Sequence, residues 1–164
     1  MPDAATRQIR LRNITPEDYA LVIRVVDDWW GGRTMNAMLP KLFFVHFRDT
    51  SFVAEVNGDL VGFLIGFLSP ALTDEAYIHF VGVHPDYRKL GVGRTLYERF
   101  FDLASKAGRH RVRCVTSPVN DMSIAFHRSL GFQLAERTDD SSQVSIYQNY
   151  DGPGEDRVLL TKEL

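Results

Sequence analysis

The hydrophobic and polar positions of residues 51–67 predict a β-hairpin. Two apolar runs, SFVAEV and LVGFLIGF, flank the pair Asn57-Gly58, which type I′ hairpin turns favour because both residues tolerate a positive φ. Gly62 and Gly66 interrupt the second run. A glycine inside a strand indicates a bulge or a close contact with a neighbouring element, so we expect one of these features here.

The pattern elsewhere predicts a mixed α/β fold. Thr15 is a favourable N-cap and Pro16 suits the first helical position, so we expect a helix to begin there after a strand over residues 8–12. Residues 91–106 have helical spacing. The predicted buried stripe of that helix comprises Val92, Leu96, Phe100, Leu103 and Ala107. Further strands are predicted over residues 111–116, 133–137, 146–147 and 157–161.

A candidate anion site follows a predicted buried strand. Residues 77–83 are aromatic and β-branched, and the strand ends before Pro85. Gly91 and Gly93 then lack the Cβ atoms that would keep an anion from the backbone, and the following helix presents its unpaired N–H groups there. We expect this turn to bind a pyrophosphate. The predicted binding residues are Arg88, Lys89, Leu90, Gly91, Val92, Gly93 and Arg94.

The form of this motif limits the class of cofactor that it can bind. A dinucleotide fingerprint would have a third glycine where Leu96 stands, and a P-loop would end in Gly-Lys-Ser or Gly-Lys-Thr. The sequence Arg-x-x-Gly-x-Gly instead resembles the cofactor motif of the GNAT superfamily of acyl-CoA-dependent N-acyltransferases. Residues 120–132, NDMSIAFHRSLGF, resemble the second signature of that superfamily, with an asparagine opening a helix and Gly-Phe leading into a strand.

The resemblance implies a fold and an activity. It implies a single N-acetyltransferase domain over residues 1–164, with a mixed, mostly antiparallel sheet flanked by helices on both faces. It further implies direct transfer of an acetyl or other acyl group from acetyl-CoA to a primary amine of a small molecule or peptide. A non-catalytic module that senses acyl-CoA is the alternative. Members of the family often dimerise, so a homodimer is an open alternative.

The composition of the chain limits the classes of protein and of partner that remain. The 164 residues are 45% hydrophobic, which suits one domain with a full core. The net charge is −2 without a basic run, so we expect no nucleic-acid partner. A single cysteine, Cys114, and the lack of an apolar leader or membrane span predict a cytoplasmic protein. We read Cys114 as buried rather than nucleophilic. The histidines lack metal-ligand spacing, so we predict no metal.

The resemblance also places the rest of the cofactor. It implies that the pantetheine arm hydrogen-bonds the backbone around Val81 and Val83, and that an N–H near Val81 stabilises the oxyanion. Asn120 occupies the position of an asparagine that contacts this arm in the family. As the first residue of a predicted helix, Asn120 is alternatively a cap alone, or serves both roles.

Acyl transfer to an amine needs a base and, for the departing thiolate, a proton. Glu75, Tyr77 and His79 share one face of the predicted strand, and the family commonly draws its base from this strand. We therefore predict Glu75 or His79 as the base. His127 stands where the family usually has a tyrosine acid. It is either a replacement acid or a residue that packs or contacts the cofactor.

The sequence leaves the acceptor open. Acidic residues at 27, 28, 74 and 75 suit a cationic amine, whereas Arg33 suits a carboxylate. Trp29 and Trp30 are either core residues or part of an acceptor wall, which Gly31-Gly32 would allow to move.

Overall fold

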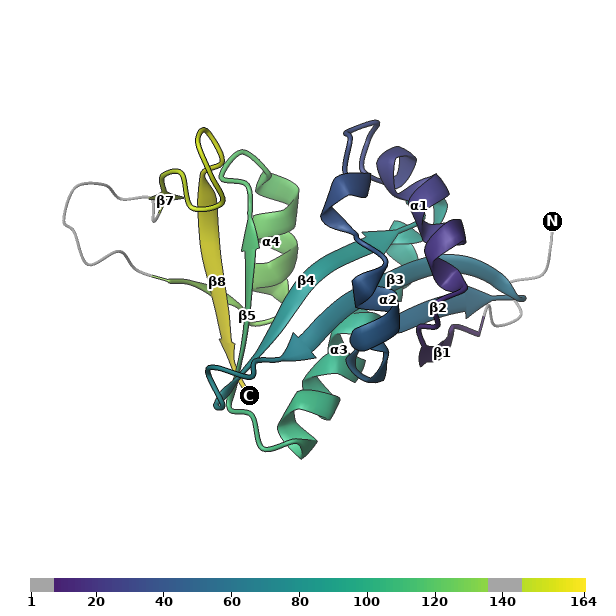
Figure 1. Cartoon of the computed structure of the whole chain (residues 1–164), viewed down its shortest axis with the longest axis horizontal. Helices are drawn as coiled ribbons and strands as arrows, with labels where there is room; N and C mark the ends of the chain where they lie inside the picture. The colour runs from purple at the N-terminus through teal and green to yellow at the C-terminus, as the bar shows by residue number, and fades with distance from the viewer. Residues whose placement is uncertain (1–7, 136–145) are drawn as a thin grey trace. The chain divides into compact units, whose positions relative to one another are not determined.

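The computed structural model describes residues 8–135 and 146–164, and its contacts divide the chain into two compact units (Figure 1). The first unit takes in the chain up to Phe67 and residues 78–103. The second takes in residues 68–77 and the chain from Ala104 onwards. The single domain over residues 1–164 stays a prediction.

The first unit is a sheet with helices on both faces. Strands β1 and β2 are antiparallel, β2 and β3 are antiparallel, and β4 lies beside β3. Its strands are β1 (Arg10–Asn13), β2 (Phe52–Val56), β3 (Asp59–Leu68) as far as Phe67, and β4 (Glu75–Val83) from Ile78 onwards. Its helical segments are α1 (Asp18–Trp29), η1 (Asn36–Met38), α2 (Leu42–His46), η2 (Arg48–Thr50), η3 (Pro85–Leu90) and α3 (Val92–Lys106) as far as Leu103.

The two faces of this sheet are packed differently. The face under α1 and α2 carries an apolar cluster to which the helices and strands both contribute. Its members are Ile14, Val22, Val26, Trp29, Leu39, Phe44, Val53, Phe63, Ile65 and Phe80. On the other face α3 approaches β3 so closely that a Cβ added at Gly62 would lie 2.8 Å from Cγ1 of Val92. This close contact confirms the expectation drawn from the glycine in the strand.

The hairpin between β2 and β3 confirms its predicted turn. Asn57 and Gly58 have φ values of 52° and 82°, the positive pair that a type I′ turn requires. The register between β2 and β3 also shifts between Ala54 and Glu55, so a bulge accompanies the close contact with α3.

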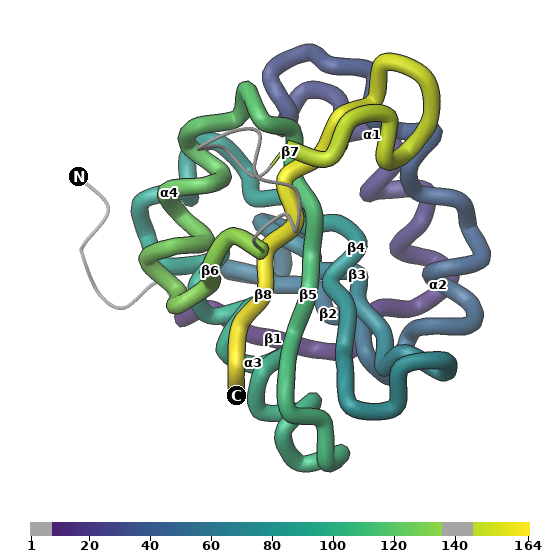
Figure 2. The backbone as a smooth tube through the Cα atoms, turned by 90° about the vertical axis from the view of Figure 1, so that its left-hand side faces the viewer, coloured from purple at the N-terminus to yellow at the C-terminus, as the bar shows by residue number. Residues whose placement is uncertain are grey.

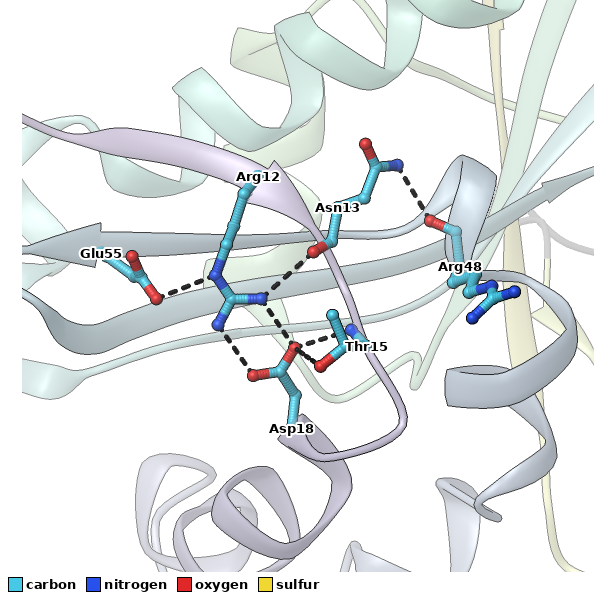
Figure 3. Close-up of polar contacts among 6 residues, drawn as sticks. All are labelled: Arg12, Asn13, Thr15, Asp18, Arg48 and Glu55. Atoms are coloured by element: carbon cyan, nitrogen blue, oxygen red, sulfur yellow. Dashed lines mark hydrogen bonds and ion pairs between the residues drawn. The ribbon is translucent and has the colours of Figure 1, made fainter.

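The start of α1 differs from the prediction. Helix α1 begins at Asp18, and Thr15 is not its N-cap. Asp18 instead accepts bonds from the Thr15 backbone N–H (2.7 Å) and from both terminal nitrogens of Arg12 (2.8 Å each), as Figure 3 shows. Burial opposes ionisation of Asp18, but these bonds outweigh it and lower the pKa of the carboxyl group. The ion pair with β1 therefore fixes where the helix begins.

The second unit is organised around β5 (Arg111–Thr116). This strand pairs in parallel with Glu75–Tyr77 of β4 and antiparallel with β8 (Arg157–Glu163). Strands β6 (Gln133–Leu134) and β7 (Ile146–Tyr147) also pair with β8, and Figure 2 shows β6, β8 and β5 side by side. The mixed, mostly antiparallel sheet is as predicted. The end of the strand predicted over residues 133–137 lies outside the described residues.

Helix α4 (Asp121–Ser129) covers one face of β5. The hydroxyl of Thr116 donates to Ser123 Oγ on α4 at 3.1 Å, and Cys114 on the same face is buried. Burial raises the pKa of the Cys114 thiol, which fits packing rather than nucleophilic attack. In α3, Ala104 is buried and Ala107 is exposed, because the helix ends at Lys106 before the predicted stripe does.

Candidate functional site

A short 3₁₀ helix and one left-handed glycine join β4 to α3. His84 Nδ1 accepts a bond from the Asp86 N–H (3.1 Å) and caps η3, and Gly91 follows with a φ of 83°. A Cβ added at Gly91 would meet no atom within 4 Å, so the space beside its backbone is open. Gly93 lies within the first turn of α3 instead of in the turn before it. The predicted glycine turn therefore depends on one left-handed residue.

The N-terminus of α3 presents free donors next to this space. Thr95 makes the first backbone bond into the helix, from its N–H to the Gly91 carbonyl (3.0 Å). The N–H groups of Val92, Gly93 and Arg94 donate to no acceptor among the residues that the structure describes. A helix start with three unpaired N–H groups and open space is suited to binding an anion.

Arg88 is engaged elsewhere. Its Nη2 donates to the carbonyl of Trp29 at the end of α1, and its Nε approaches the Val83 carbonyl at 3.4 Å. Lys89 is exposed, and the half-exposed Arg94 lies 3.9 Å from Glu98. Charge for an anion at this turn would come from Lys89 and Arg94 more readily than from Arg88, which holds the end of α1.

The backbone of β4 offers N–H groups at its edge away from β3. The His84 N–H bonds Val61 of β3, so by alternation the backbone groups of Val81 and Val83 point the other way. The Val81 carbonyl accepts a bond from Trp30 Nε1 (3.2 Å), and Arg88 approaches that of Val83. A ligand running along β4 would therefore meet the N–H groups of Val81 and Val83 rather than their carbonyls.

His79 is held in one tautomer. Its Nε2 lies 2.6 Å from the carbonyl oxygen of Met38. A carbonyl only accepts, so Nε2 carries the proton and Nδ1 of the neutral ring bears a lone pair. The imidazole also stacks on Phe43, with ring centroids 4.4 Å apart. His79 thus has a fixed orientation and one nitrogen able to accept a proton.

Glu75 lies in an ion pair. The residue is 8% exposed, and its Oε1 lies 2.7 Å from Arg113 Nε and 3.6 Å from Arg111 Nη1. One carboxylate oxygen is therefore shared by two guanidinium groups. This geometry suits an anchor for Arg113 better than a base, although the base role of Glu75 stays a prediction.

Asn120 caps α4 as predicted. Its Oδ1 accepts a bond from the Ser123 N–H at 3.1 Å. The predicted contact of Asn120 with the pantetheine arm stays a prediction.

His127 is buried, and its neutral ring carries the proton on Nδ1. The residue is 7% exposed, and Nδ1 lies 2.7 Å from the Ser123 carbonyl, so Nδ1 is the donor. Burial lowers the pKa of His127, against the opposing effect of this bond. In the neutral ring Nε2 carries no proton, so proton donation from Nε2 would need the imidazolium that burial disfavours. The acid role stays a prediction against which this tautomer counts.

The buried His127 also predicts a loss of stability at acidic pH. Because its folded pKa lies below the ordinary value, its contribution is complete above about pH 6.5 and is lost as the pH falls toward the folded pKa. The loss is up to about 1.4 kcal/mol per unit of pKa difference. His127→Asn keeps a donor for Ser123 without titrating, so its unfolding midpoint should fall less than that of the wild type between about pH 8 and pH 5.5. Equal falls of the unfolding midpoint in the wild type and in His127→Asn would contradict this prediction.

The paired tryptophans have different surroundings: Trp29 is a core residue, and the acceptor-wall role of Trp30 stays a prediction. Trp29 is 5% exposed and stacks on Phe63, as a core residue does. Trp30 is half-buried, packs on Phe80 with centroids 4.9 Å apart and bonds β4. Sequence analysis missed this bond, because Val81 lies far from Trp30 in the sequence.

The loop after α1 is closed by hydrogen bonds to the Asp27 carboxylate. Asp27 Oδ1 accepts bonds from the N–H groups of Met35 (2.7 Å) and Asn36 (3.0 Å), which closes the loop over Gly31 and Gly32. Asp27 is therefore not an unengaged acid available to a cationic acceptor. Sequence analysis also missed Met38 and Phe43 as partners of His79, because neither is near it in the sequence.

Residues 8–135 and 146–164 hold no group of three or more His, Cys, Asp or Glu side chains placed to bind one metal ion. None of the helices in these ranges has the length and apolar character needed to cross a bilayer. The absence of a metal and the cytoplasmic location stay predictions.

Known proteins place this geometry in a family. The model of the acetyltransferase (GNAT) family matches residues 13–132. The chain belongs to this family. The resemblance drawn from the two sequence motifs is thereby confirmed, and membership supports an enzyme that depends on acyl-CoA.

Two curated relatives in the family have named acceptors. An L-2,4-diaminobutyric acid acetyltransferase from Nocardia farcinica is 36% identical over 124 residues, covering 73% of this chain and 64% of that protein. A ribosomal protein bS18 alanine N-acetyltransferase from Escherichia coli is 33% identical over 113 residues, covering 69% of this chain and 70% of that protein. The chain thus spans less than two-thirds of the length of the Nocardia relative.

A solved structure shares the fold. The diaminobutyrate acetyltransferase from Paenibacillus lautus, in complex with L-2,4-diaminobutyric acid and coenzyme A, has a TM-score of 0.70 and 19% identity. The match covers 95% of each chain. At this identity the likeness bears on the fold alone.

Proposed function

We propose that this GNAT protein transfers an acetyl group from acetyl-CoA directly to a primary amine of a small molecule or peptide. The observation that carries the proposal is the open space at Gly91 beside the three unpaired N–H groups that begin α3. In a member of this family, that arrangement suits the pyrophosphate of acetyl-CoA. The relatives from Nocardia and Escherichia act by name on a diamino acid and on an alanine of a ribosomal protein, so both acceptor kinds remain in the proposal.

The side chains of the first unit supply the proposed base. A primary amine has a pKa near 10 and is largely protonated at neutral pH. The lone pair on His79 Nδ1 accepts the ammonium proton, directly or through water, because Nε2 is committed to the Met38 carbonyl. The neutral amine then attacks the thioester carbonyl. The N–H of Val81 is proposed to stabilise the oxyanion.

The attacking nitrogen then loses its second proton to solvent, and collapse of the tetrahedral intermediate breaks the C–S bond, which gives the amide and the thiolate of coenzyme A. A thiol has a pKa near 8.5, so the thiolate is a fair leaving group without an acid. We therefore propose that His127 serves α4 as a buried hydrogen-bonded residue, and that solvent returns the proton to the thiolate.

Thermal unfolding with acetyl-CoA tests the proposal without knowledge of the acceptor. Ligand at 100 times its Kd adds about 2.7 kcal/mol to the free energy of unfolding. We expect the midpoint to rise by roughly 5–11 °C with acetyl-CoA and to stay unchanged with ATP or NAD. No rise with acetyl-CoA would contradict the cofactor assignment.

Release of the coenzyme A thiol distinguishes the enzyme from the sensor alternative. An enzyme releases thiol when an acceptor amine is added, whereas a sensor binds acetyl-CoA without turnover. Relatives that are named acetyltransferases favour the enzyme. The homodimer, the lack of a nucleic-acid partner and the cytoplasmic location rest on sequence alone.

A further inference from the structure

Four aromatic side chains of the first unit form one continuous row of ring contacts. Trp29 stacks on Phe63 with ring centroids 6.1 Å apart, and Phe63 stacks on Phe80 at 5.9 Å. Phe80 in turn packs against Trp30 at 4.9 Å. The first three residues are at most 5% exposed, whereas Trp30 is half-buried. Trp30 is therefore the ring at which this aromatic row reaches the surface of the unit.

The packing behind Trp30 holds its indole in place. A Cβ added at Gly82 would lie 2.5 Å from Cε1 of Phe63, so the aromatic row already presses against the backbone of β4. The backbone N–H of Trp30 donates to the Val26 carbonyl (3.0 Å), and its Nε1 donates to the Val81 carbonyl (3.2 Å). A close-packed interior accepts added atoms only by shifting side chains or backbone. The indole is thus a fixed wall at β4.

This wall stands at the edge of β4 that the thioester would use. The N–H and the carbonyl of one extended residue point to the same edge of a strand. Trp30 bonds the Val81 carbonyl, and the Val81 N–H is the group proposed to bind the thioester oxygen. A thioester held by that N–H therefore lies beside the indole ring.

The course of the cofactor arm decides which end of the thioester faces the wall. Gly91 and the start of α3 follow the C-terminal end of β4, so an arm that begins at this turn reaches Val83 before Val81. The sulfur then faces Val83, and the acyl carbons continue toward the preceding residue, Phe80. Because Trp30 packs on Phe80, the carbons beyond the carbonyl meet the indole.

We propose that Trp30 determines the acyl specificity of this enzyme, admitting an acetyl group and excluding longer chains such as butyryl. Acetyl adds a single methyl group beyond the carbonyl. The two further methylenes of butyryl would have to displace a ring that the aromatic row and two hydrogen bonds hold. The inference rests on the proposed function, and it gives the acyl end of that site a residue that lies in neither sequence motif.

Affinity for acyl-CoA tests this role without knowledge of the acceptor. Isothermal titration compares coenzyme A, acetyl-CoA and butyryl-CoA, which differ only at the acyl end. We expect the wild type to bind butyryl-CoA about 10- to 100-fold more weakly than acetyl-CoA, in line with the usual cost of overpacking. Trp30→Ala removes the wall, so it should bind the two with similar affinity while its affinity for coenzyme A stays at the wild-type level.

Two further variants control for lost packing. Trp30→Leu keeps an apolar contact with Phe80 but removes most of the indole, so it should reduce the difference between the two acyl-CoA affinities in a folded protein. Phe101 is also a half-buried aromatic residue of the first unit, but it lies on α3 and packs edge-on against Tyr97. Phe101→Ala should lower the unfolding midpoint without changing the acyl preference.

The remaining outcomes distinguish the role of Trp30 from the proposed function. Equal or tighter binding of butyryl-CoA by the wild type, or an unchanged affinity ratio in both Trp30 variants, would overturn the wall, while binding of acetyl-CoA leaves the proposed function standing. Weaker binding of coenzyme A itself by Trp30→Ala would place the indole on the pantetheine arm and overturn the wall as well. Wild-type protein that bound neither coenzyme A nor acetyl-CoA would show that the proposed function itself has failed.

Discussion

Gly91→Val is expected to abolish acetyl-CoA binding in a protein that remains folded. Gly91 has a φ of 83°, where a residue with a Cβ costs on the order of 1–3 kcal/mol, and the new side chain would fill the space beside the α3 N-terminus. Losing two hydrogen bonds to a charged phosphate lowers affinity by roughly 100-fold or more. Isothermal titration with acetyl-CoA measures the affinity, and the unfolding midpoint measures the strain.

Gly108→Val is the control that distinguishes backbone strain from loss of the anion site at Gly91. Gly108 has a φ of 79° and, like Gly91, open space around a would-be Cβ, but it lies after the end of α3. The two variants should lose similar stability, and Gly108→Val should bind acetyl-CoA as the wild type does. Tight binding by Gly91→Val would show that the pyrophosphate lies elsewhere.

His79→Gln is expected to lower kcat by roughly 10²- to 10⁴-fold, the usual contribution of a general base. A glutamine amide can still donate to the Met38 carbonyl, so the local structure should persist while the proton-accepting nitrogen is lost. Steady-state thiol release measures kcat for the wild type and the variant.

His46→Gln is the matched control for that substitution. His46 is an exposed histidine at the end of α2, and its replacement should leave kcat and KM unchanged. If His79→Gln kept the wild-type kcat, the base would have to be sought elsewhere, with Glu75 as the next candidate. A rise in KM alone would make His79 a residue that positions the acceptor.

The sequence motifs led to the family because their chemistry is local. A phosphate site at a helix start needs a glycine, a few unpaired N–H groups and the helix itself, all within one short stretch. The same stretch did not indicate that Arg88 bonds the end of α1, because the Trp29 carbonyl is supplied by a distant part of the chain. Arg88 was therefore predicted as an anion ligand, whereas the tertiary structure gives it a partner.

Elements whose conformation depends on neighbouring residues were determined by the sequence alone. The Asn57-Gly58 turn requires two positive φ values, and the Asn120 cap requires one side-chain bond three residues ahead, so short-range interactions suffice. The start of α1, in contrast, was decided by Arg12 of β1, whose bonds to Asp18 override the capping preference of Thr15.

The same distinction applies to the candidate site. The sequence determined which residue types are present on β4, and the period of two placed Glu75 and His79 on one face. Only the tertiary structure decided their states, because the partners come from elsewhere in the chain: Arg113 for Glu75, and the Met38 carbonyl for His79. The tautomer of a side chain, and the donor and acceptor atoms that it leaves unpaired, depend on such long-range contacts. No local pattern specifies them.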